Sequence, residues 1–365
     1  MPTDKRNTQV RLILNNLFEK ATSEEEINEQ EYITQLNQLF TTQAWGFREI
    51  LLVVIVAMKL NSNYKASTGL YECNPRAIYE GPIKEFLIEK NIPHRKSGPL
   101  NVAKATVGLD NTWAAQRRPA VVAEQVVELV NYLETPGCDR ETRIDNVGVS
   151  LLRCLINETI RIGELTVTID DNTDPCHIYS LCYQLTTQTP DAGNTPQKIA
   201  AFLLKNYHLF PRSGIIVTGA EDRASVTSTT SKKPGDVNEE IAGTILKVYE
   251  ITVKKFDLAR IIDSYDCITD YNHQNATNIH EVIVICRSKD CPEEMEYSGL
   301  YGYLGKYAYQ DVIYYFWDIF EWYSNTLQRM TDEARLGFYM NLNDYINEIN
   351  TAEDVKNLWH NLHHE

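Results

Sequence analysis

The segment PGDVNEEIAGTILKVYEITVK, residues 234–254, predicts a β-hairpin with charged side chains on both of its arms. The Gly243-Thr244 pair supplies the turn between the two arms. Asp236 lies on the first arm, and Glu250 and Lys254 lie on the second. Carboxylate oxygens are the ligands that Mg²⁺ prefers, so two acids on adjacent strands can share this ion. The hairpin therefore predicts a magnesium site with Asp236 and Glu250 as its ligands.

Side chains alternate between the two faces of a strand, which places Glu250, Thr252 and Lys254 on the same face. A lysine at this position can orient or deprotonate a metal-bound water, and phosphodiester hydrolysis needs such a water. In a regular strand, at ~3.3 Å per residue, the Cα of Lys254 would lie roughly 13 Å from that of Glu250. A bulge or strong twist would shorten this distance, or Thr252 could help to hold the water instead.

Each of these residues also has a purely structural interpretation. Asp236 follows Pro-Gly and is therefore typical of a β-turn. Glu250 lies in an otherwise largely apolar strand, where acids are depleted, but it could occupy the exposed face of an edge strand. Lys254 and Lys255 end the strand, where lysines commonly protect an edge from pairing with another chain.

The composition predicts a folded protein that does not span a membrane. The chain has 365 residues, 43% of them hydrophobic. Its longest apolar run covers the nine residues 50–58, and a bilayer-spanning helix needs about 20. The first six residues lack the apolar core of a signal peptide, and the eight cysteines include no C-x-x-C pair. We expect free thiols and a cytoplasmic location.

The order of the segments predicts a mostly helical α+β fold. Residues 1–209 are expected to form a mainly helical region for scaffolding and DNA recognition, and residues 210–365 a nuclease core with C-terminal helices. Residues 45–60 are apolar nearly all round, as in a buried helix. The apolar run 282–285 predicts a strand covered on both faces. Residues 310–347, rich in Tyr and Trp, are expected to be helical.

The charge distribution leaves room for DNA binding despite a net charge of −15. Residues 84–118 carry seven Lys or Arg and three Asp or Glu. The Ser- and Thr-rich segment 222–233, expected to be a mobile loop, ends in two further lysines. A solvated basic face is the alternative interpretation of both regions. The candidate DNA-binding residues are Arg95, Lys96, Asn101, Lys104, Arg117, Arg118, Lys232 and Lys233.

The succession of strand, loop, acid-bearing hairpin, helix and buried strand resembles the catalytic core of the PD-(D/E)xK nuclease superfamily, a small mixed sheet flanked by helices. Within it, the chain is similar to the SacI-type family of type II restriction endonucleases. The matching segments are Asn74-Pro75-Arg76-Ala77, Ser97-Gly98-Pro99-Leu100-Asn101, Pro196-Gln197-Lys198-Ile199 and Pro234-Gly235-Asp236-Val237 leading to Glu250. The superfamily pattern has its lysine two residues after the glutamate, where this chain has Thr252.

The resemblance implies a Mg²⁺-dependent enzyme that cuts both strands of double-stranded DNA at a short symmetric site, normally as a homodimer. A protein with two-fold symmetry suits a palindromic target, because each subunit meets an identical half-site. Two alternatives stay open: a non-specific or repair-type DNA nuclease on the same core, and a non-enzymatic helical interaction protein whose acids only decorate a hairpin.

Overall fold

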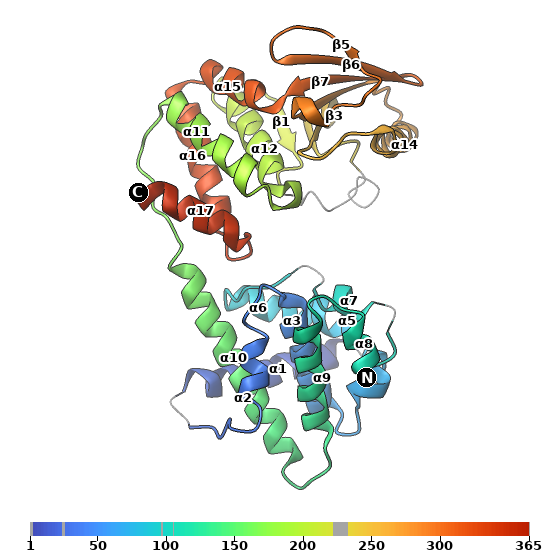
Figure 1. Cartoon of the computed structure of the whole chain (residues 1–365), viewed down its shortest axis with the longest axis vertical. Helices are drawn as coiled ribbons and strands as arrows, with labels where there is room; N and C mark the ends of the chain where they lie inside the picture. Colours follow the sequence, from blue (N-terminus) through green and yellow to red (C-terminus); the bar gives the residue numbers. More distant parts are fainter. Residues whose placement is uncertain (1–2, 24–25, 96–97, 105, 222–232, 365) are drawn as a thin grey trace. The chain divides into compact units, whose positions relative to one another are not determined.

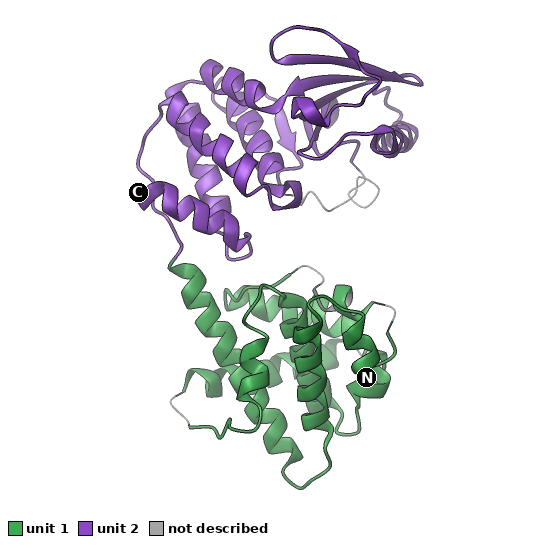
Figure 2. Ribbon diagram, viewed as in Figure 1, with its two compact units in different colours: residues 1–164 green, residues 165–365 purple. Residues whose placement is uncertain are grey.

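The computed structural model describes residues 3–23, 26–95, 98–104, 106–221 and 233–364. The chain forms two compact units, Met1–Glu164 and Leu165–Glu365 (Figure 1, Figure 2). Within the described residues, no helix combines the length and the apolar character needed to cross a bilayer.

Unit 1 is built from helices and short helical turns. They are α1 (Thr3–Thr22), α2 (Ile33–Gln38), α3 (Trp45–Leu60), α4 (Ala66–Gly69), η1 (Leu70–Cys73), α5 (Pro75–Ile78), η2 (Tyr79–Ile83), α6 (Lys84–Glu89), α7 (Gly98–Ala103), α8 (Asn111–Ala115), α9 (Ala120–Glu134) and α10 (Arg140–Gly163).

The core of unit 1 surrounds α3, whose residues from Trp45 to Met58 are all buried. Helices α1, α9 and α10 pack against it. A helix that is apolar on every side is stable in water only when other elements cover it, because exposed apolar surface costs free energy. The prediction of a buried helix over residues 45–60 is confirmed.

Unit 2 combines helices with one sheet. Its elements are α11 (Pro175–Gln188), η3 (Asp191–Gly193), α12 (Asn194–Leu209), β1 (Ile216–Thr218), β2 (Val237–Ile241), β3 (Thr244–Ile251), α14 (Leu258–Asn275), β4 (Glu281–Cys286), η4 (Ser288–Asp290), β5 (Glu296–Tyr297), β6 (Tyr303–Tyr309), β7 (Val312–Asp318), α15 (Ile319–Arg329), α16 (Asp332–Asn347) and α17 (Glu353–His364).

The sheet has seven strands in the order β1-β2-β3-β4-β7-β6-β5. Strands β1, β2 and β3 pair antiparallel, β4 pairs parallel with both β3 and β7, and the β7-β6-β5 part is antiparallel again. This mixed sheet, with the helices around it and the helical unit 1, confirms the prediction of a mainly helical α+β fold. The run 282–285 lies in β4, between two parallel neighbours, and its side chains pack on separate cores on the two faces of the sheet, which confirms the prediction of a strand covered on both faces.

Different helices cover the two faces of the sheet. One face, with Val237, Tyr249 and Ile285, packs on a core shared with α11, α12, α15 and α16. The opposite face, with Val248 and Val284, packs on a second core that includes residues of α14. Adjacent residues of one strand, such as Val248 and Tyr249, therefore belong to different cores.

The structure divides the chain earlier than the predicted boundary between residues 209 and 210. Helices α11 and α12 belong to unit 2, because their buried side chains, such as Leu185 and Leu203, share one core with Tyr323 and Phe338 of the C-terminal helices.

The prediction of helices over residues 310–347 is wrong at its start. Residues 312–318 form strand β7, and helices begin only at Ile319. Val312, Tyr314 and Phe316 alternate as the buried side chains of that strand. Aromatic and β-branched residues pack well on a pleated sheet, and this period of two overrides the helical interpretation.

Candidate functional site

The hairpin of β2 and β3 brings Asp236 and Glu250 together as an acid pair. Val237 is the register partner of Tyr249, so the residues next to them, Asp236 and Glu250, fall opposite each other on the other face. The two carboxyl groups are close enough for each to shift the pKa of the other. Both carboxyl groups lie on the face of the sheet that α14 covers. Val248, two residues before Glu250 and therefore on the same face, packs in a core with residues of α14.

Local backbone packing fixes the position of Asp236. Its Oδ2 accepts a hydrogen bond of 3.0 Å from the backbone N–H of Ile251. The buried side chain of Gln197, on α12, reaches the backbone carbonyl of Asp236 with its Nε2 at 3.4 Å. The pair therefore depends on contacts from both strands and from a helix that comes earlier in the chain.

Gly235 is needed because the two arms approach closely beside Asp236. A methyl group at this residue would lie 2.5 Å from Val248 Cγ1 and 2.9 Å from the carbonyl oxygen of Tyr249. We expect Gly235→Ala to destabilise the protein by about 1–3 kcal/mol, because the neighbours must shift to make room. Urea unfolding measures this loss, with Gly163→Ala as control, since a methyl group there meets nothing within 4 Å. Equal stability of both variants would contradict the tight approach.

The surroundings of Glu250 come from α14. Glu250 is only 5% exposed, and its Oε1 accepts a hydrogen bond of 3.4 Å from the hydroxyl of Ser264. Arg260 lies 3.8 Å from Oε2 through its Nη2. The same guanidinium donates from Nη1 to the Thr252 hydroxyl at 2.6 Å and lies over the Phe256 ring.

Burial and mutual repulsion govern the charges of the acid pair. Burial raises the pKa of Glu250 well above its usual range, and the negative charge of Asp236 raises it further. Although Asp236 is only half-buried, the atoms packed around its carboxyl raise its pKa too, against the lowering effects of the Ile251 N–H and of Arg260. The pair thus carries more negative charge than one arginine balances, which favours an added proton or a metal cation.

The donor set suits a hard cation. Two carboxyl groups offer only oxygen ligands, which Mg²⁺ prefers, and Mg²⁺ usually keeps several waters. Among the residues that the structure describes, no group of three or more His, Cys, Asp or Glu could hold a metal ion. Water and backbone oxygens would therefore have to complete the coordination of an ion held by Asp236 and Glu250.

Lys254 does not join the acid pair. Strand β3 ends at Ile251, so the alternation that predicted a shared face no longer applies at Lys254. The Thr252 hydroxyl accepts from the Lys254 N–H at 3.0 Å and donates to the Lys254 carbonyl at 3.1 Å, which turns the chain away from the strand. The Lys254 side chain is exposed. Arg260, and not Lys254, provides the positive charge beside the acids. The Thr252 hydroxyl proton is donated to the Lys254 carbonyl, so it is not free to bind a water.

The predicted DNA-binding residues fall into separate places. Arg95, Asn101, Lys104 and Arg118 are exposed on unit 1. Arg117 is half-buried and donates to the Lys104 carbonyl at 2.9 Å, which brings these two residues together. Lys233 precedes β2 in unit 2 and is half-buried. Lys96 and Lys232 lie outside the described residues, as does the whole of the loop predicted over residues 222–233 except Lys233.

Comparison with known proteins assigns the chain to no family. No protein-family model matches it, and no curated protein matches it either.

Sequence reasoning missed Arg260 and Ser264. Both lie on the first turns of α14, whose N-cap Asp257 accepts from the Arg260 N–H at 3.1 Å. The residues DLAR at 257–260 do predict a helix start, because aspartate is a favoured N-cap. Nothing in that pattern indicates which strand the helix will face, so the role of Arg260 became visible only in the fold.

Proposed function

We propose that unit 2 is a Mg²⁺-dependent nuclease that hydrolyses phosphodiester bonds in double-stranded DNA. The observation that carries the proposal is the convergence of Asp236 and Glu250 on the β2-β3 hairpin of a mixed sheet. The parallel strand β4, which follows after α14, supports the resemblance to the PD-(D/E)xK core noted from the sequence. The raised pKa values of the two carboxyl groups add support, because perturbed acids cluster at catalytic sites.

The residues have distinct roles in this proposal. Asp236 and Glu250 would hold the ion through carboxylate oxygens. Bound there, Mg²⁺ would make a coordinated water more acidic and stabilise negative charge on the scissile phosphate. Arg260 keeps Glu250 and Thr252 in place and lowers the pKa of both acids, so it favours their ionised, ligating form.

The resemblance to the SacI-type family gives the proposal its finer form: a homodimer that cuts a short symmetric DNA sequence. The test is a digest of a sequenced phage genome by the full chain with Mg²⁺ or Mn²⁺, followed by mapping of the fragment ends. Discrete fragments with one common end sequence are expected. A smear would overturn sequence specificity but keep the nuclease, and uncut DNA with both metals would overturn the nuclease as well.

Arg260 and Lys254 can be told apart by substitution. We expect Arg260→Gln to lower the cleavage rate by about tenfold or more, because it removes a charge-assisted contact to the acid pair. The acidic limb of the pH–rate profile should also move to higher pH, since Arg260 holds down the pKa of Glu250. Lys254→Gln, the matched control, should cleave at the wild-type rate. If Lys254→Gln cleaved more slowly than Arg260→Gln, Lys254 rather than Arg260 would be the cation that assists the acid pair.

A further inference from the structure

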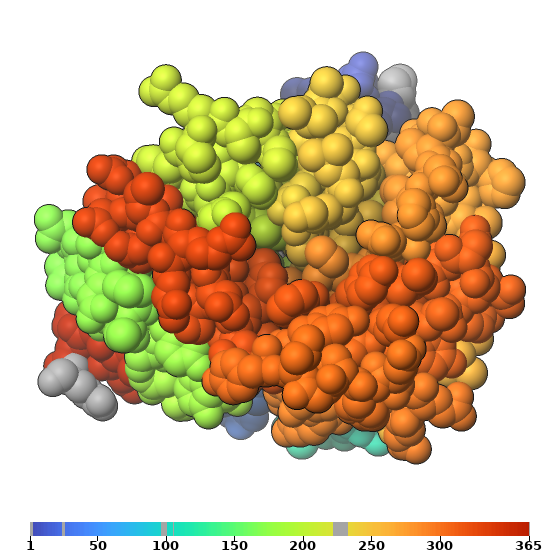
Figure 3. Space-filling model, turned by 90° about the horizontal axis from the view of Figure 1, so that it is seen from above, coloured from blue at the N-terminus to red at the C-terminus, as the bar shows by residue number. Residues whose placement is uncertain are grey.

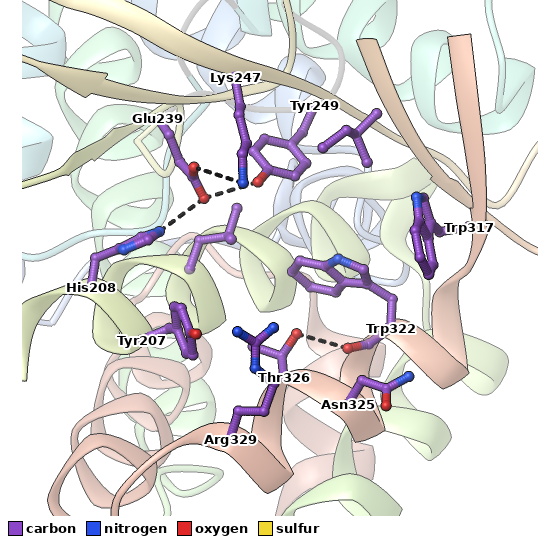
Figure 4. A pocket seen from close by; sticks show the side chains of 12 residues that line it. Tyr207, His208, Glu239, Lys247, Tyr249, Trp317, Trp322, Asn325, Thr326 and Arg329 are labelled. Carbon is purple, nitrogen blue, oxygen red and sulfur yellow. Dashed lines mark hydrogen bonds and ion pairs between the residues drawn. The ribbon is translucent and has the colours of Figure 1, made fainter. Parts of the chain in front are cut away.

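A second candidate site lies on the face of the sheet opposite the acid pair. A cavity of about 540 Å³ opens there, between α12, the strands β2, β3, β4 and β7, and α15 (Figure 4). In Figure 3 the segments that carry its lining residues, coloured yellow-green, yellow, orange and red, meet on the surface of unit 2. Small-molecule sites commonly have volumes of about 300–1,000 Å³. We call this cavity the Glu239 pocket.

One wall of the Glu239 pocket is polar and built around a buried acid. Glu239 is 2% exposed, and its Oε1 accepts from the Tyr249 hydroxyl and pairs with His208 Nε2, both at 2.9 Å. Lys247, the register partner of Glu239, has its Nζ 3.8 Å from Oε2. Figure 4 shows these side chains pointing toward one another. This wall is pre-organised, because each group is held by another.

The opposite wall is aromatic, with a cation at its edge. The half-buried indoles of Trp317 and Trp322 line it, and Trp322 makes an edge contact with Tyr249, ring centroids 6.5 Å apart. The exposed Arg329 lies over the Tyr207 ring, its Cζ 5.2 Å from the centroid. Flat π surfaces favour planar ligands, and Lys247 and Arg329 favour an anionic group.

We propose that the Glu239 pocket binds an unpaired nucleotide, with the base stacked on Trp322 and the phosphate held by Lys247 and Arg329. Both features of the ligand have a counterpart in the lining, because the indoles offer a flat apolar surface and the Lys247 ammonium and the Arg329 guanidinium can donate to phosphate oxygens. The Asn325 side chain, exposed on the same rim, can both donate to and accept from a base edge. This site is separate from the acid pair and does not rest on the nuclease proposal.

The nucleotide can come from a nucleic acid strand or from the free pool. A neighbouring cavity of about 460 Å³ shares Lys247, Ile283 and Trp317 with the Glu239 pocket and reaches Tyr303. Tyr303 and Trp317 pack with their ring centroids 5.2 Å apart, which extends the aromatic surface along the sheet. Single-stranded nucleic acid binds on aromatic platforms of this kind, where each stacked base contributes about 1–3 kcal/mol.

The test measures binding of the full chain, in buffer with EDTA, to a fluorescein-labelled single-stranded DNA decamer and, by calorimetry, to deoxyadenosine monophosphate. The absence of metal prevents cleavage from interfering. Lys247→Gln and Arg329→Gln should each weaken binding by about tenfold. Lys205→Gln, the same charge change on the exposed side of α12, should leave binding unchanged. A base stacked on Trp322 should also quench the tryptophan fluorescence of the protein. Trp322→Phe keeps a flat ring but should remove most of this quenching.

Each outcome decides the proposal. If the decamer alone shows this pattern of variants, the pocket binds a nucleotide within a strand. If the mononucleotide shows it as well, the pocket accepts the free nucleotide. Absence of binding to both probes, or equal weakening by Lys205→Gln, would overturn the proposal and leave the nuclease proposal untouched.

Discussion

Asp236→Asn is expected to lower the rate of Mg²⁺-dependent DNA cleavage at least about a thousandfold, because a metal site supplies several kcal/mol of transition-state stabilisation. The amide keeps an oxygen that can accept the Ile251 N–H, so the hairpin should stay folded. It removes the negative charge that Asp236 would give a divalent ion. Cleavage of plasmid DNA under single-turnover conditions measures this effect, and Glu250→Gln should behave in the same way.

The same substitution should stabilise the protein when metal is absent. In the native state, burial and the charge of Asp236 raise the pKa of Glu250, so ionisation of the pair at neutral pH costs free energy. Removal of the Asp236 charge from this incompletely neutralised pair relieves that cost. We expect a higher melting temperature than wild type in EDTA, and loss of the further increase that bound Mg²⁺ would give to wild type.

The control for this prediction is Glu240→Gln, which removes a half-buried acid from β2, the strand that begins directly after Asp236. It should leave cleavage and the metal-dependent shift of the melting temperature unchanged. A loss of cleavage with reduced stability in EDTA would indicate that Asp236 is structural. Full activity of Asp236→Asn and Glu250→Gln would remove the acid pair as the catalytic site.

The sequence was sufficient to locate the acid pair because its pattern is local. Both acids lie on the arms of one hairpin, so the sequence could name them without other elements. Their exact pairing depends on a bulge between Glu239 and Glu240, which shifts the register by one residue and was not predicted. The buried helix α3 was equally predictable, since its apolar character is continuous. The run 282–285 was recognisable for the same reason, because a strand buried on both faces shows no alternation.

The remaining features depend on contacts between distant segments. Arg260 reaches Glu250 only because α14 packs on one face of the sheet, and the sequence of α14 does not say which face. Glu239 looks like any acid in a strand, next to Glu240, until α12 brings His208 onto it. The strand β7 was mistaken for a helix because its aromatic residues continue directly into α15. In each of these three examples, tertiary packing rather than local propensity determines the structure.

Glu49→Gln is expected to raise the free energy of unfolding at pH 8 by about 3 kcal/mol, with almost no effect near pH 4. Glu49 lies on α3 and is 4% exposed. Its Oε1 accepts from the Tyr79 hydroxyl at 2.7 Å and from the Arg95 N–H at 2.6 Å, while its buried Oε2 has no hydrogen-bond partner among the described residues. Burial, opposed by these two donors, raises the pKa of Glu49 to about 7.

The direction of the pH dependence follows from proton binding. Below the ordinary pKa of 4.5, both the folded and the unfolded chain hold the proton on Glu49, so it does not affect stability. Between 4.5 and about 7 the unfolded chain releases the proton and the folded chain keeps it, so the free energy of unfolding falls as the pH rises. Above about 7 both states are ionised, and the loss stays constant at about 1.4 kcal/mol for each unit of the shift.

Urea unfolding at a series of pH values measures this difference between wild type and Glu49→Gln. Other groups titrate equally in both proteins, so their contributions cancel in the difference. Glu128→Gln, an exposed acid on α9 in the same unit, should show a difference close to zero at every pH. A Glu49→Gln difference that does not grow between pH 4.5 and 7 would mean that the buried carboxyl is ionised in the folded protein, with a cation or water on its free oxygen.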